Sequence, residues 1–477
     1  MSVRAPSEIY PVLIFHVDVN SAFLSWSALK ELQKNPEGVD LRTIPSAVAG
    51  DIETRHGIIT AKSIPAKKYG IETAEPVASA LRKCPNLVLV KSDFETYRKY
   101  SKALMAILKT YSDEVQQVSI DEAYLDMTWR WSDPDPLLPV RIAGEIREEV
   151  KKKLGFTVNV GISVNKLLAK TASDFAKPDQ THTLWPEEIP EKLWPMPIGA
   201  LHGCGHATAG RLEGIGIRTV GDAARTDPAV LKSLLGEKTG TYILESANGL
   251  GSVHVSSERD EAKSYSNEIT TASDIRAEDF ENEAIPMIRR LSRKVSERLK
   301  RDQVYGKSVT VSVKTDHFKR RSRQVTLTDS SNDASVIEAN AVMLARELLF
   351  GESGPFTRGE GIRLIGVGVS HLDRGEYRQL SLFDYFGPEL SAEQERPQTS
   401  QQAAAPQPQQ SRERAAAPQP QQPGERAAAP QPQQAEELAA DQMPDEQESK
   451  DPRREKLDAM MARIRAKYGE RSIRRGQ

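Results

Sequence analysis

The chain has 477 residues, with 65 Lys and Arg, 67 Asp and Glu, 38% hydrophobic residues and two cysteines. This length corresponds to roughly three or four ordinary domains and excludes a single small module, while the low cysteine content excludes a disulfide-rich scaffold. The apolar runs fall well short of the roughly 20 residues that span a membrane, and the first residues lack a signal-peptide pattern, so we expect a cytoplasmic protein without membrane segments.

Charge is unevenly distributed along the chain, although the formal net charge is only −2. Residues 284–325 carry thirteen Lys or Arg and three Asp or Glu, whereas residues 391–450 carry five basic and ten acidic residues. A local excess of positive charge is typical of surfaces that bind phosphates. The near-neutral total therefore does not exclude nucleic-acid binding.

The first 170 residues alternate short β-branched runs with amphipathic segments, which predicts an α+β domain. Residues 12–17 are expected to form a buried strand, and residues 114–126 two strand segments around a tight turn. A helix at 140–154 precedes another strand at 157–163. Two alternations of strand and helix on one sheet are enough for a ferredoxin-like layer.

The next segments differ in character. Short helices interrupted by glycine are expected over 173–249, which indicates a small helical module. From 264 to 373 the pattern predicts strand, helix, strand, strand, helix, strand, with the second helix at 334–350 and the last strand at 363–370. This order implies a second sheet with helices on one face.

The C-terminal part of the chain is of low complexity. The sequence AAAPQPQQ recurs every 12 residues, at Ala403, Ala415 and Ala427, and so polar a repeat cannot bury a core. We therefore expect a disordered linker rich in Gln, Pro and Ala over 391–450. Residues 451–477 regain a basic amphipathic pattern, and a lone helix of this length is marginal in water, so we expect it to fold on a further protein partner.

Three acidic residues occupy the ends of predicted strands. Asp18 follows an apolar strand, and Asp121 and Glu122 lie at the turn within 114–126. If both strands lie centrally in one sheet, the carboxylates converge at one edge and can hold two divalent cations about 3.5–4 Å apart, an arrangement that activates a hydroxyl and neutralises a triphosphate leaving group. The alternative for any one of these residues is an acid that only caps a turn.

The segments around these acids resemble known motifs. HVDVNSAF at 16–23 and SIDEAYLD at 119–126 are similar to the two metal-binding motifs of Y-family translesion DNA polymerases, most closely those of the bacterial polymerase IV branch. The similarity extends from about residue 10 to 385, through AKKYG at 66–70, VGIS at 160–163 and AKP at 176–178. The motifs do not decide between the polymerase IV branch and a polymerase V-like branch.

The resemblance implies a role for each motif residue. Asp18, Asp121 and Glu122, with the Val19 carbonyl, would be catalytic ligands of two Mg²⁺ ions, and Glu122 would lie nearest the primer hydroxyl. Phe23 matches the aromatic steric gate, whose ring against the sugar C2′ leaves no room for a ribose hydroxyl. The alternative for Phe23 is a core aromatic at the start of a helix.

Two lysines match positions that hold the incoming triphosphate in the family, Lys67 and Lys170. The sequence departs from the common pattern nearby, because Lys67 stands where Arg is frequent and Ile64 where Tyr is frequent. A bidentate clamp and a hydroxyl contact are then lost, which would alter nucleotide affinity or phosphate geometry. Asn20 replaces a frequent Asp that is not a metal ligand, so we expect catalysis to survive.

The DNA contacts implied by the resemblance lie further along the chain. Residues 201–205 followed by 209–212 resemble a helix-hairpin-helix, in which Gly203 and Gly205 let backbone N–H groups approach a phosphate; a simple tight turn is the alternative. The basic segment resembles the little finger, whose phosphate contacts weaken with salt. We expect its strand and loop cations, rather than those of the preceding helix, to contact DNA: Lys314, Lys319, Arg320, Arg321 and Arg323.

A short peptide after the last strand, Gln379-Leu380-Ser381-Leu382-Phe383, resembles the motif by which bacterial polymerases bind the sliding clamp (β-clamp). Leu382 and Phe383 would fill an apolar pocket while Gln379 makes polar contacts, and Leu380 is counted with them among the clamp-binding residues. The alternative is an apolar end to the domain.

The resemblance as a whole implies an α+β right-hand polymerase with a monomeric core. It would copy primer-template DNA from dNTPs with Mg²⁺, past lesions, with errors and without proofreading. The expected domains are a ferredoxin-like palm (1–24 and 78–172), small fingers (25–77), a helical thumb (173–249), a β-α-β-β-α-β little finger (250–375), a clamp-binding region (376–390), the linker (391–450) and the terminal helix (451–477).

Two other functions are weighed against this one. A nonpolymerising Y-family accessory protein would be a binding module, but such relatives typically lack the metal carboxylates. A nucleotide cyclase could share a palm-like sheet and two metals, yet it has no use for a DNA hairpin or a clamp peptide. Primer extension by the purified protein separates all three.

Overall fold

The computed structural model describes residues 11–50, 57–132, 135, 137–258 and 261–374. The chain separates into two units, residues 1–386 and 387–477, and the second lies outside the described residues. The predicted clamp-binding region, linker and terminal helix also lie outside them. Among the helices that are described, none is both long and apolar enough to cross a membrane.

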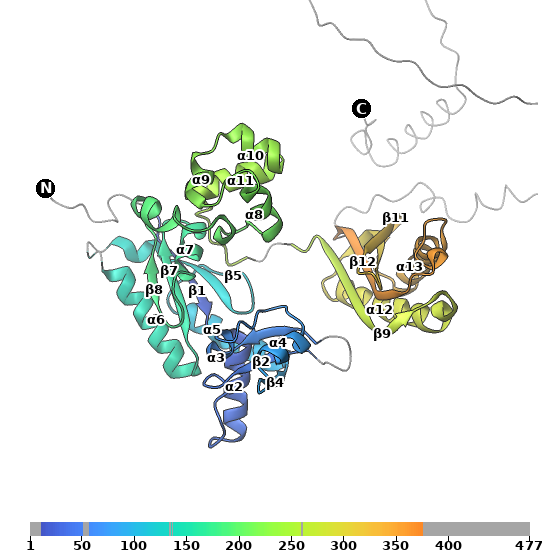
Figure 1. Ribbon diagram of the computed structural model, residues 1–477, viewed down its shortest axis with the longest axis horizontal. Coiled ribbons are helices and arrows are strands. Elements are labelled where there is room, and N and C mark those ends of the chain that lie inside the picture. The colour runs from blue at the N-terminus through green and yellow to red at the C-terminus, as the bar shows by residue number, and fades with distance from the viewer. Residues whose placement is uncertain (1–10, 51–56, 133–134, 136, 259–260, 375–477) are drawn as a thin grey trace, which may run out of the picture. The chain divides into compact units, whose positions relative to one another are not determined.

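A five-stranded sheet organises the first part of the chain (Figure 1). The strand order is β5-β6-β1-β7-β8, and the central strand β1 pairs antiparallel with both β6 and β7. The buried β-branched side chains of the central strands suit a sheet that is covered on both faces. The strands are β1 (Ile14–Val19), β5 (Val115–Gln117), β6 (Glu122–Asp126), β7 (Val158–Ser163) and β8 (Thr181–Thr183).

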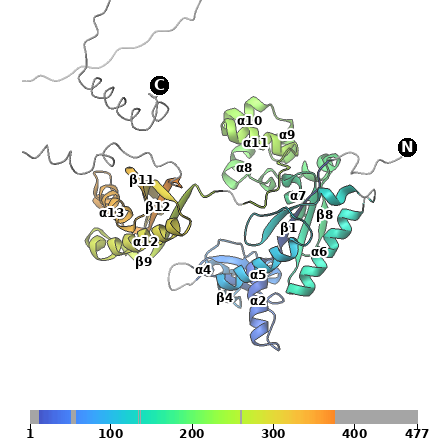
Figure 2. The same ribbon diagram turned by 180° about the vertical axis from the view of Figure 1, so that it is seen from behind.

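Helices cover both faces of this sheet. α5 (Phe94–Leu108) and α6 (Leu138–Leu154) share a buried cluster with Phe15 and Val17 of β1, and both views show α6 along β7 and β8 (Figures 1 and 2). α7 (Lys166–Ser173) packs on the opposite face against β1 and β7. The α+β layer expected from the sequence is therefore present.

Gly161 on β7 is what lets α7 lie so close to the sheet. A Cβ atom at this position would lie 2.0 Å from the carbonyl oxygen of Ala169 and 2.4 Å from the backbone nitrogen of Ser173. Both obstacles are backbone atoms of α7 or of its last residue, so any side chain here would push the helix away.

A smaller sheet of order β3-β2-β4 forms a second layer. β2 pairs antiparallel with β3 and parallel with β4, and α3 and α4 pack on it around Ala47 and Ala80. Because α4 and β4 belong to this group, the predicted boundary between fingers and palm at residue 77 falls inside it. The elements are β2 (Ser46–Ala49), β3 (Ile59–Lys62), α3 (Ile64–Lys67), α4 (Val77–Lys83) and β4 (Val88–Lys91).

Short helices follow over the predicted thumb. They surround one buried cluster that includes Leu212, Leu231 and Ile243. α2 (Ala22–Lys34), near the start of the chain, packs instead on the small sheet, since its Leu24 and Ala28 share a cluster with Val48 of β2. The short helices are α8 (His206–Glu213), α9 (Val220–Arg225), α10 (Pro228–Leu235) and α11 (Glu237–Ala247).

A four-stranded sheet of order β11-β10-β12-β9 occupies residues 264–373. Its elements follow one another as β-α-β-β-α-β, the order that the sequence predicts. Ile288, Leu291, Val295 and Leu299 form the buried stripe of α12 over the same sheet face that α13 covers. The elements are β9 (Ser264–Ile275), α12 (Ile285–Arg301), β10 (Tyr305–Thr315), β11 (Arg320–Ser331), α13 (Ala334–Phe350) and β12 (Ile362–Asp373).

Candidate active site

Strand pairing brings the predicted acids together at one end of the five-stranded sheet. Asp18 of β1 and Glu122 of β6 are register partners in neighbouring strands, and the backbone nitrogen of Val19 donates to the carbonyl oxygen of Asp121 at 3.0 Å. Side chains at opposed positions of an antiparallel pair lie on the same face. The carboxylates of Asp18 and Glu122 therefore face each other.

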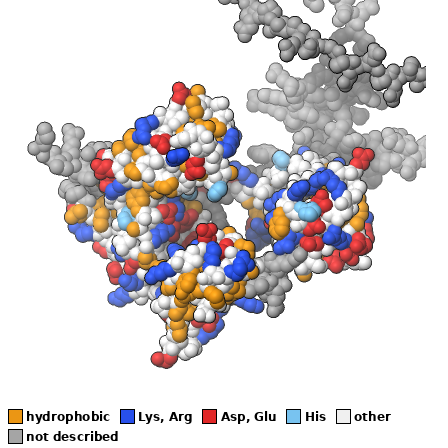
Figure 3. Space-filling model, viewed as in Figure 1, with side chains coloured by type: hydrophobic (Ala, Val, Ile, Leu, Met, Phe, Trp, Pro, Cys, Tyr) orange, Lys and Arg blue, Asp and Glu red, His pale blue; other side chains and the backbone are white. Residues whose placement is uncertain are grey.

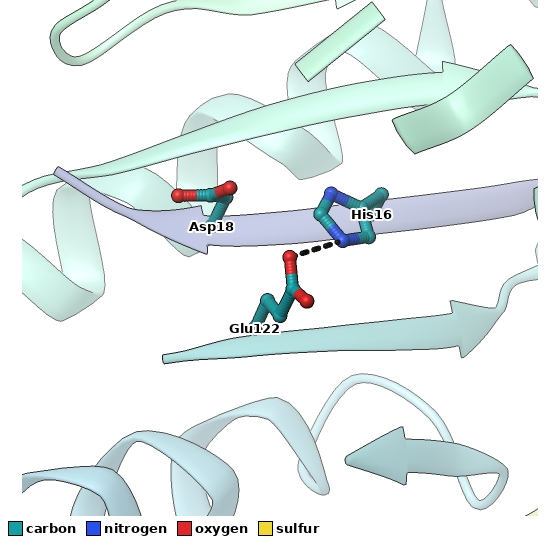
Figure 4. A group of neighbouring side chains, drawn as sticks. All are labelled: His16, Asp18 and Glu122. Carbon is teal, nitrogen blue, oxygen red and sulfur yellow. Dashed lines mark ion pairs between the residues drawn. The ribbon is translucent and has the colours of Figure 1, made fainter. Parts of the chain in front are cut away.

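A histidine joins these two carboxylates (Figure 4). One ligand atom each of His16, Asp18 and Glu122 lies within 4.8 Å of the others. His16 and Asp18 are two residues apart on β1, so both point to the face that α7 covers. This set of oxygen and nitrogen donors has the composition of a divalent metal site.

Asp121 lies beside this group and differs from it electrostatically. The hydroxyl of Ser119 donates to its Oδ1 at 2.6 Å. Burial raises the pKa of Asp121, and the neighbouring charges of Asp18 and Glu122 raise it further. Closely spaced carboxylates resist ionising together, so a bound cation would favour the charged form of all three.

Lys170 of α7 forms ion pairs with the acids. Its Nζ lies 2.9 Å from Asp18 Oδ2 and 2.9 Å from Glu122 Oε2, and Lys177 Nζ lies 3.2 Å from the same Asp18 oxygen. Burial alone would lower the pKa of Lys170, but the surrounding carboxylates, Asp18 first, raise it above its ordinary value. An ammonium thus bridges Asp18 and Glu122. A cation is stabilised at this point, which fits the predicted use of these acids as metal ligands.

His16 was not among the predicted site residues. Its ring is fully buried, with Nδ1 2.8 Å from Ser173 Oγ and Nε2 3.4 Å from Glu122 Oε2. Burial lowers the pKa of His16, while His16 and then Lys170 hold the pKa of Glu122 at about 2. The signal in the sequence was its spacing, since a polar residue two positions before Asp18 shares the face of Asp18.

The hydrogen bonds of the Asn20 side chain go to β7 and to the segments beside it, and among the described residues none goes to the acids. Its Nδ2 donates to Asn159 Oδ1 at 3.1 Å, and its Oδ1 accepts from Thr157 Oγ1 and from the backbone nitrogen of Asp179, both at 2.9 Å. These bonds tie the end of β1 to β7. That catalysis survives the departure at Asn20 stays a prediction.

Comparison with known proteins decides the family. Residues 17–174 match the model of the impB/mucB/samB family, and residues 262–382 match the model of its C-terminal domain. DNA polymerase IV of Clostridium acetobutylicum is 40% identical over 78% of this chain and 90% of its own length. DNA polymerase IV 1 of Bacillus subtilis is 35% identical over 78% and 86% of the two chains.

This chain belongs to the bacterial DNA polymerase IV branch of the Y-family. A solved Y-family DNA polymerase chimera of Dbh and Dpo4 has the same fold, with a TM-score of 0.65 and 24% identity over 75% of this chain and 98% of that one. As a member of this family, the protein is a DNA-directed DNA polymerase.

Phe23 of the polymerase lies at the start of α2 and is half-buried. Its ring stacks on Tyr97 of α5, with centroids 4.5 Å apart and planes 10° apart, and meets the edge of Phe94 at 6.0 Å. Offset stacking of this kind fixes the orientation of a ring. Phe23 is therefore held by the core and also presents a surface to solvent.

Lys67 and Ile64 of the polymerase both lie on α3 and are exposed. Lys67 forms no ion pair with any residue that the structure describes. Its neighbour Lys62 has a lowered pKa, mainly through burial and then through the charge of Lys67. Lys62 and Lys67 thus place two positive charges close together, with Glu72 and Glu75 also acting on Lys62.

The glycine hairpin of the polymerase has the backbone that its sequence requires. Gly203 has φ +82°, and a Cβ there would lie 2.5 Å from the ring of Tyr242, so a larger residue is excluded. Gly205 is the N-cap residue of α8 and, being a glycine, has no side chain that could accept a hydrogen bond from the helix. The first N–H groups of α8 have no partner within their own helix.

The predicted DNA-binding cations of the second sheet do not share one surface. Lys314 and Arg320 are register partners on the open face of the sheet, and Lys319 is exposed in the turn. Arg321 and Arg323 point to the opposite face, because side chains alternate along β11. In Figure 3 basic and acidic side chains are interleaved over this domain.

All three arginines already have partners, and on the open face Arg320 forms an ion pair with Glu268 of β9. Arg323 Nε lies 2.8 Å from Glu347 Oε2 of α13, and Arg321 donates to the carbonyl oxygen of Ser353 at 3.1 Å. These contacts do not test whether Lys314, Lys319, Arg320, Arg321 and Arg323 bind DNA, and their DNA contacts stay a prediction.

Proposed function

We propose that this polymerase carries out error-prone synthesis past template lesions by two-metal nucleotidyl transfer. The observation that carries the proposal is the ammonium of Lys170 between Asp18 and Glu122, with both oxygens at 2.9 Å. An acidic group that already binds one cation tightly is suited to divalent cations. The names and fold of the relatives support polymerisation on DNA.

Asp18, Asp121 and Glu122, with the Val19 carbonyl oxygen, would hold two Mg²⁺ ions. When bound, such ions lower the pKa of a hydroxyl nucleophile and neutralise charge on a leaving group. The primer 3′ oxygen forms a bond to the α-phosphorus of the dNTP, the bond from that phosphorus to the bridging oxygen breaks, and pyrophosphate leaves. Glu122 is placed on the primer side in this scheme.

Under this proposal Lys170 contacts first the carboxylates of Asp18 and Glu122 and then the triphosphate. When divalent cations bind the carboxylates, its ammonium is released from Asp18 and Glu122 and becomes available to the triphosphate. Lys67, exposed on α3 without an ion pair to a described residue, supplies a second positive charge. Two single-point ammonium contacts replace the planar clamp of an arginine, so we expect a loosely oriented triphosphate.

Phe23 would act as the steric gate. A ring fixed by stacking on Tyr97 cannot yield to an extra hydroxyl at C2′ of the incoming sugar. We infer that ribonucleotides are excluded by a steric clash with the Phe23 ring rather than by a polar interaction with their 2′-hydroxyl. Replacing Phe23 by Ala should let ribonucleotides be incorporated.

DNA binding and tethering complete the proposal. Gly203 and Gly205 would bring backbone N–H groups to a phosphate, and Lys314, Lys319 and Arg320 would contact DNA from the second sheet. Gln379–Phe383 would bind the sliding clamp and raise the local concentration of polymerase at the primer. Errors would not be excised, which is checked by incubating a mismatched primer without nucleotides.

The deciding experiment is primer extension by purified protein with Mg²⁺. The variants Asp121→Ala and Glu122→Ala should fold normally but lose several kcal/mol of transition-state stabilisation, roughly a thousandfold in rate. Asp113→Ala, an exposed acid outside the group, is the matched control. Unchanged extension by both active-site variants would remove the catalytic assignment. Absence of extension by the wild type would favour a binding module instead.

A further inference from the structure

A cationic groove lies beside the catalytic turn and has no role in the proposal above. It has a volume of about 640 Å³ and is lined by Arg98 and Lys102 of α5, Lys109 directly after it, and residues 118–120 of the turn before Asp121. None of its lining residues is acidic. We call it the α5 groove. A neighbouring hollow of about 430 Å³ shares Lys109 with it but is also lined by Glu258.

The cations of the α5 groove are unpaired as far as the described residues go. Arg98, Lys102 and Lys109 are exposed, and none forms an ion pair or side-chain hydrogen bond with a described residue. On the neighbouring helix α6, by contrast, Lys151 pairs with Asp179 and Lys153 with Glu149. Like charges four residues apart on a helix repel each other. Binding of a polyanion in the groove would therefore relieve this repulsion.

The wall of the groove is tied to the catalytic acids. The amide nitrogen of Gln117 donates to Ser101 Oγ of α5 at 3.2 Å and to the carbonyl oxygen of Ser119 at 2.9 Å. Ser119 in turn donates through its hydroxyl to Asp121 at 2.6 Å. A ligand in the groove would thus contact Ser119, which is hydrogen-bonded to Asp121, one of the proposed metal ligands.

The length of the groove selects the class of polyanion. Eleven residues separate Arg98 from Lys109, which corresponds to about 16 Å along a helix. Pyrophosphate or a triphosphate is too short to reach all three cations. A nucleic-acid strand advances roughly 3.4 Å per nucleotide, so about five nucleotides span this distance. Val118, which is 52% exposed, adds an apolar contact for a sugar.

We propose that the α5 groove binds the phosphodiester backbone of one strand of the primer-template next to the catalytic turn. This inference rests on the proposed function, because it takes DNA as the substrate of the neighbouring acids. It adds a contact that positions the strand from the side of α5, separate from the glycine hairpin and from the second sheet.

The test is the salt dependence of DNA binding by the full chain. The triple variant Arg98→Gln, Lys102→Gln, Lys109→Gln should reduce the slope of log K against log salt by about 0.7–0.9 for each lost contact, or roughly two to three in total. Arg290→Gln, Arg293→Gln, Lys294→Gln on α12 changes the net charge equally and should leave the slope unchanged. Anisotropy of a labelled primer-template between 50 and 200 mM salt, about the range over which such contacts are lost, measures both.

Each other outcome counts against the groove. Equal slopes for the triple variant and the wild type would overturn the proposal, as would equal losses in the two triple variants. A raised KM for dNTP with unchanged DNA affinity would assign the cations to the triphosphate instead. Because binding is measured without turnover, failure of the groove is distinct from failure of the catalytic assignment in primer extension.

A second measurement locates the strand directly. The two native cysteines are buried, so Ala106→Cys, at an exposed position that lines the groove, gives a single accessible thiol in the described chain. A short thiol-specific crosslinker at this position should capture one strand within a few nucleotides of the primer terminus. Capture of neither strand, or of DNA at random positions, would contradict the proposal.

Discussion

At the scale of single residues, the acidic group is a balance of charges rather than a row of free carboxylates. Lys170 and Lys177 both reach Asp18, and His16 reaches Glu122 from behind. A divalent cation entering this group must compete with an ammonium that is already there. The lysine is therefore expected to stabilise the metal-free protein and to weaken metal binding.

Lys170→Met should expose this competition. Without its ammonium, the partly buried carboxylates lose their main neutralising charge, and the free energy of unfolding in EDTA should fall by about 2–4 kcal/mol. Mg²⁺ should then raise the melting temperature more than it does in the wild type. Thermal unfolding with and without Mg²⁺ measures both effects, and Lys152→Met is the control. A smaller Mg²⁺ shift in the Lys170 variant would show that the lysine assists metal binding.

His16 should act through Glu122. Replacing it by Leu removes the ring that lies 3.4 Å from the carboxylate, and the loss of such an orienting contact typically weakens metal affinity by about 10–100-fold. His16→Gln keeps an N–H near the position of Nε2 and should retain most of the affinity. Electron paramagnetic resonance of Mn²⁺ binding distinguishes the variants. Identical affinities in all three proteins would reduce His16 to a packing residue.

The sequence located the residues of the acidic group but not their partners. Asp18 and Glu122 could be found because an acid at the end of an apolar strand and an acid at a tight turn between strands are both local signals. The contacts of Lys170 could not, because they depend on how closely α7 lies on β7, and no local pattern encodes that distance. His16 was missed because a lone histidine among apolar residues resembles a core position.

At the scale of elements, the position of α7 depends on a residue with no side chain. Gly161 allows the backbone of α7 to pass where a Cβ would stand, 2.0 Å from the Ala169 carbonyl oxygen. Lys170 is the next residue along that helix. The ion pairs of the acidic group therefore depend on the packing of this helix on the sheet.

Gly161→Ala should destabilise the fold by about 2–4 kcal/mol, because backbone atoms must shift rather than a flexible side chain. Primer extension should fall together with stability as Lys170 is displaced. Gly144→Ala, within α6 with open space around it, is the matched control and should stabilise by about 0.5–1 kcal/mol. Urea unfolding of both variants makes the comparison. Equal stability of the two would contradict the account of α7.

Element prediction succeeded where periodicity was long. The second helix of the second sheet was expected at 334–350 and spans Ala334–Phe350, and the helix expected at 140–154 spans Leu138–Leu154. The small sheet was not predicted, because strands of four residues give too short a pattern and the parallel pairing of β2 with β4 is not local. The faces of β11 were predictable from alternation alone.

At the scale of the whole molecule, the boundary between the two units falls after Phe386. The predicted catalytic residues and the predicted clamp-binding peptide both precede this boundary in the sequence. The part after it carries the repeats and the basic terminal segment, whose partner stays a prediction.

Truncation separates these contributions. A chain of residues 1–386 should extend primers at the full-length rate and be stimulated by the sliding clamp. A chain of residues 1–374 should extend at the same basal rate without stimulation, because it lacks Gln379–Phe383. Processive primer extension with and without clamp is the measurement. Stimulation of the shorter chain would place the clamp contact elsewhere.

The central place of β1 has a consequence for biosynthesis. β1 is flanked in the finished sheet by β6 and β7, so both of its edges stay unpaired until more than a hundred further residues have been made. Pairings of such long sequence separation form slowly, and unpaired strand edges invite aggregation in the meantime. Newly made chains should therefore depend on chaperones until β7 has emerged.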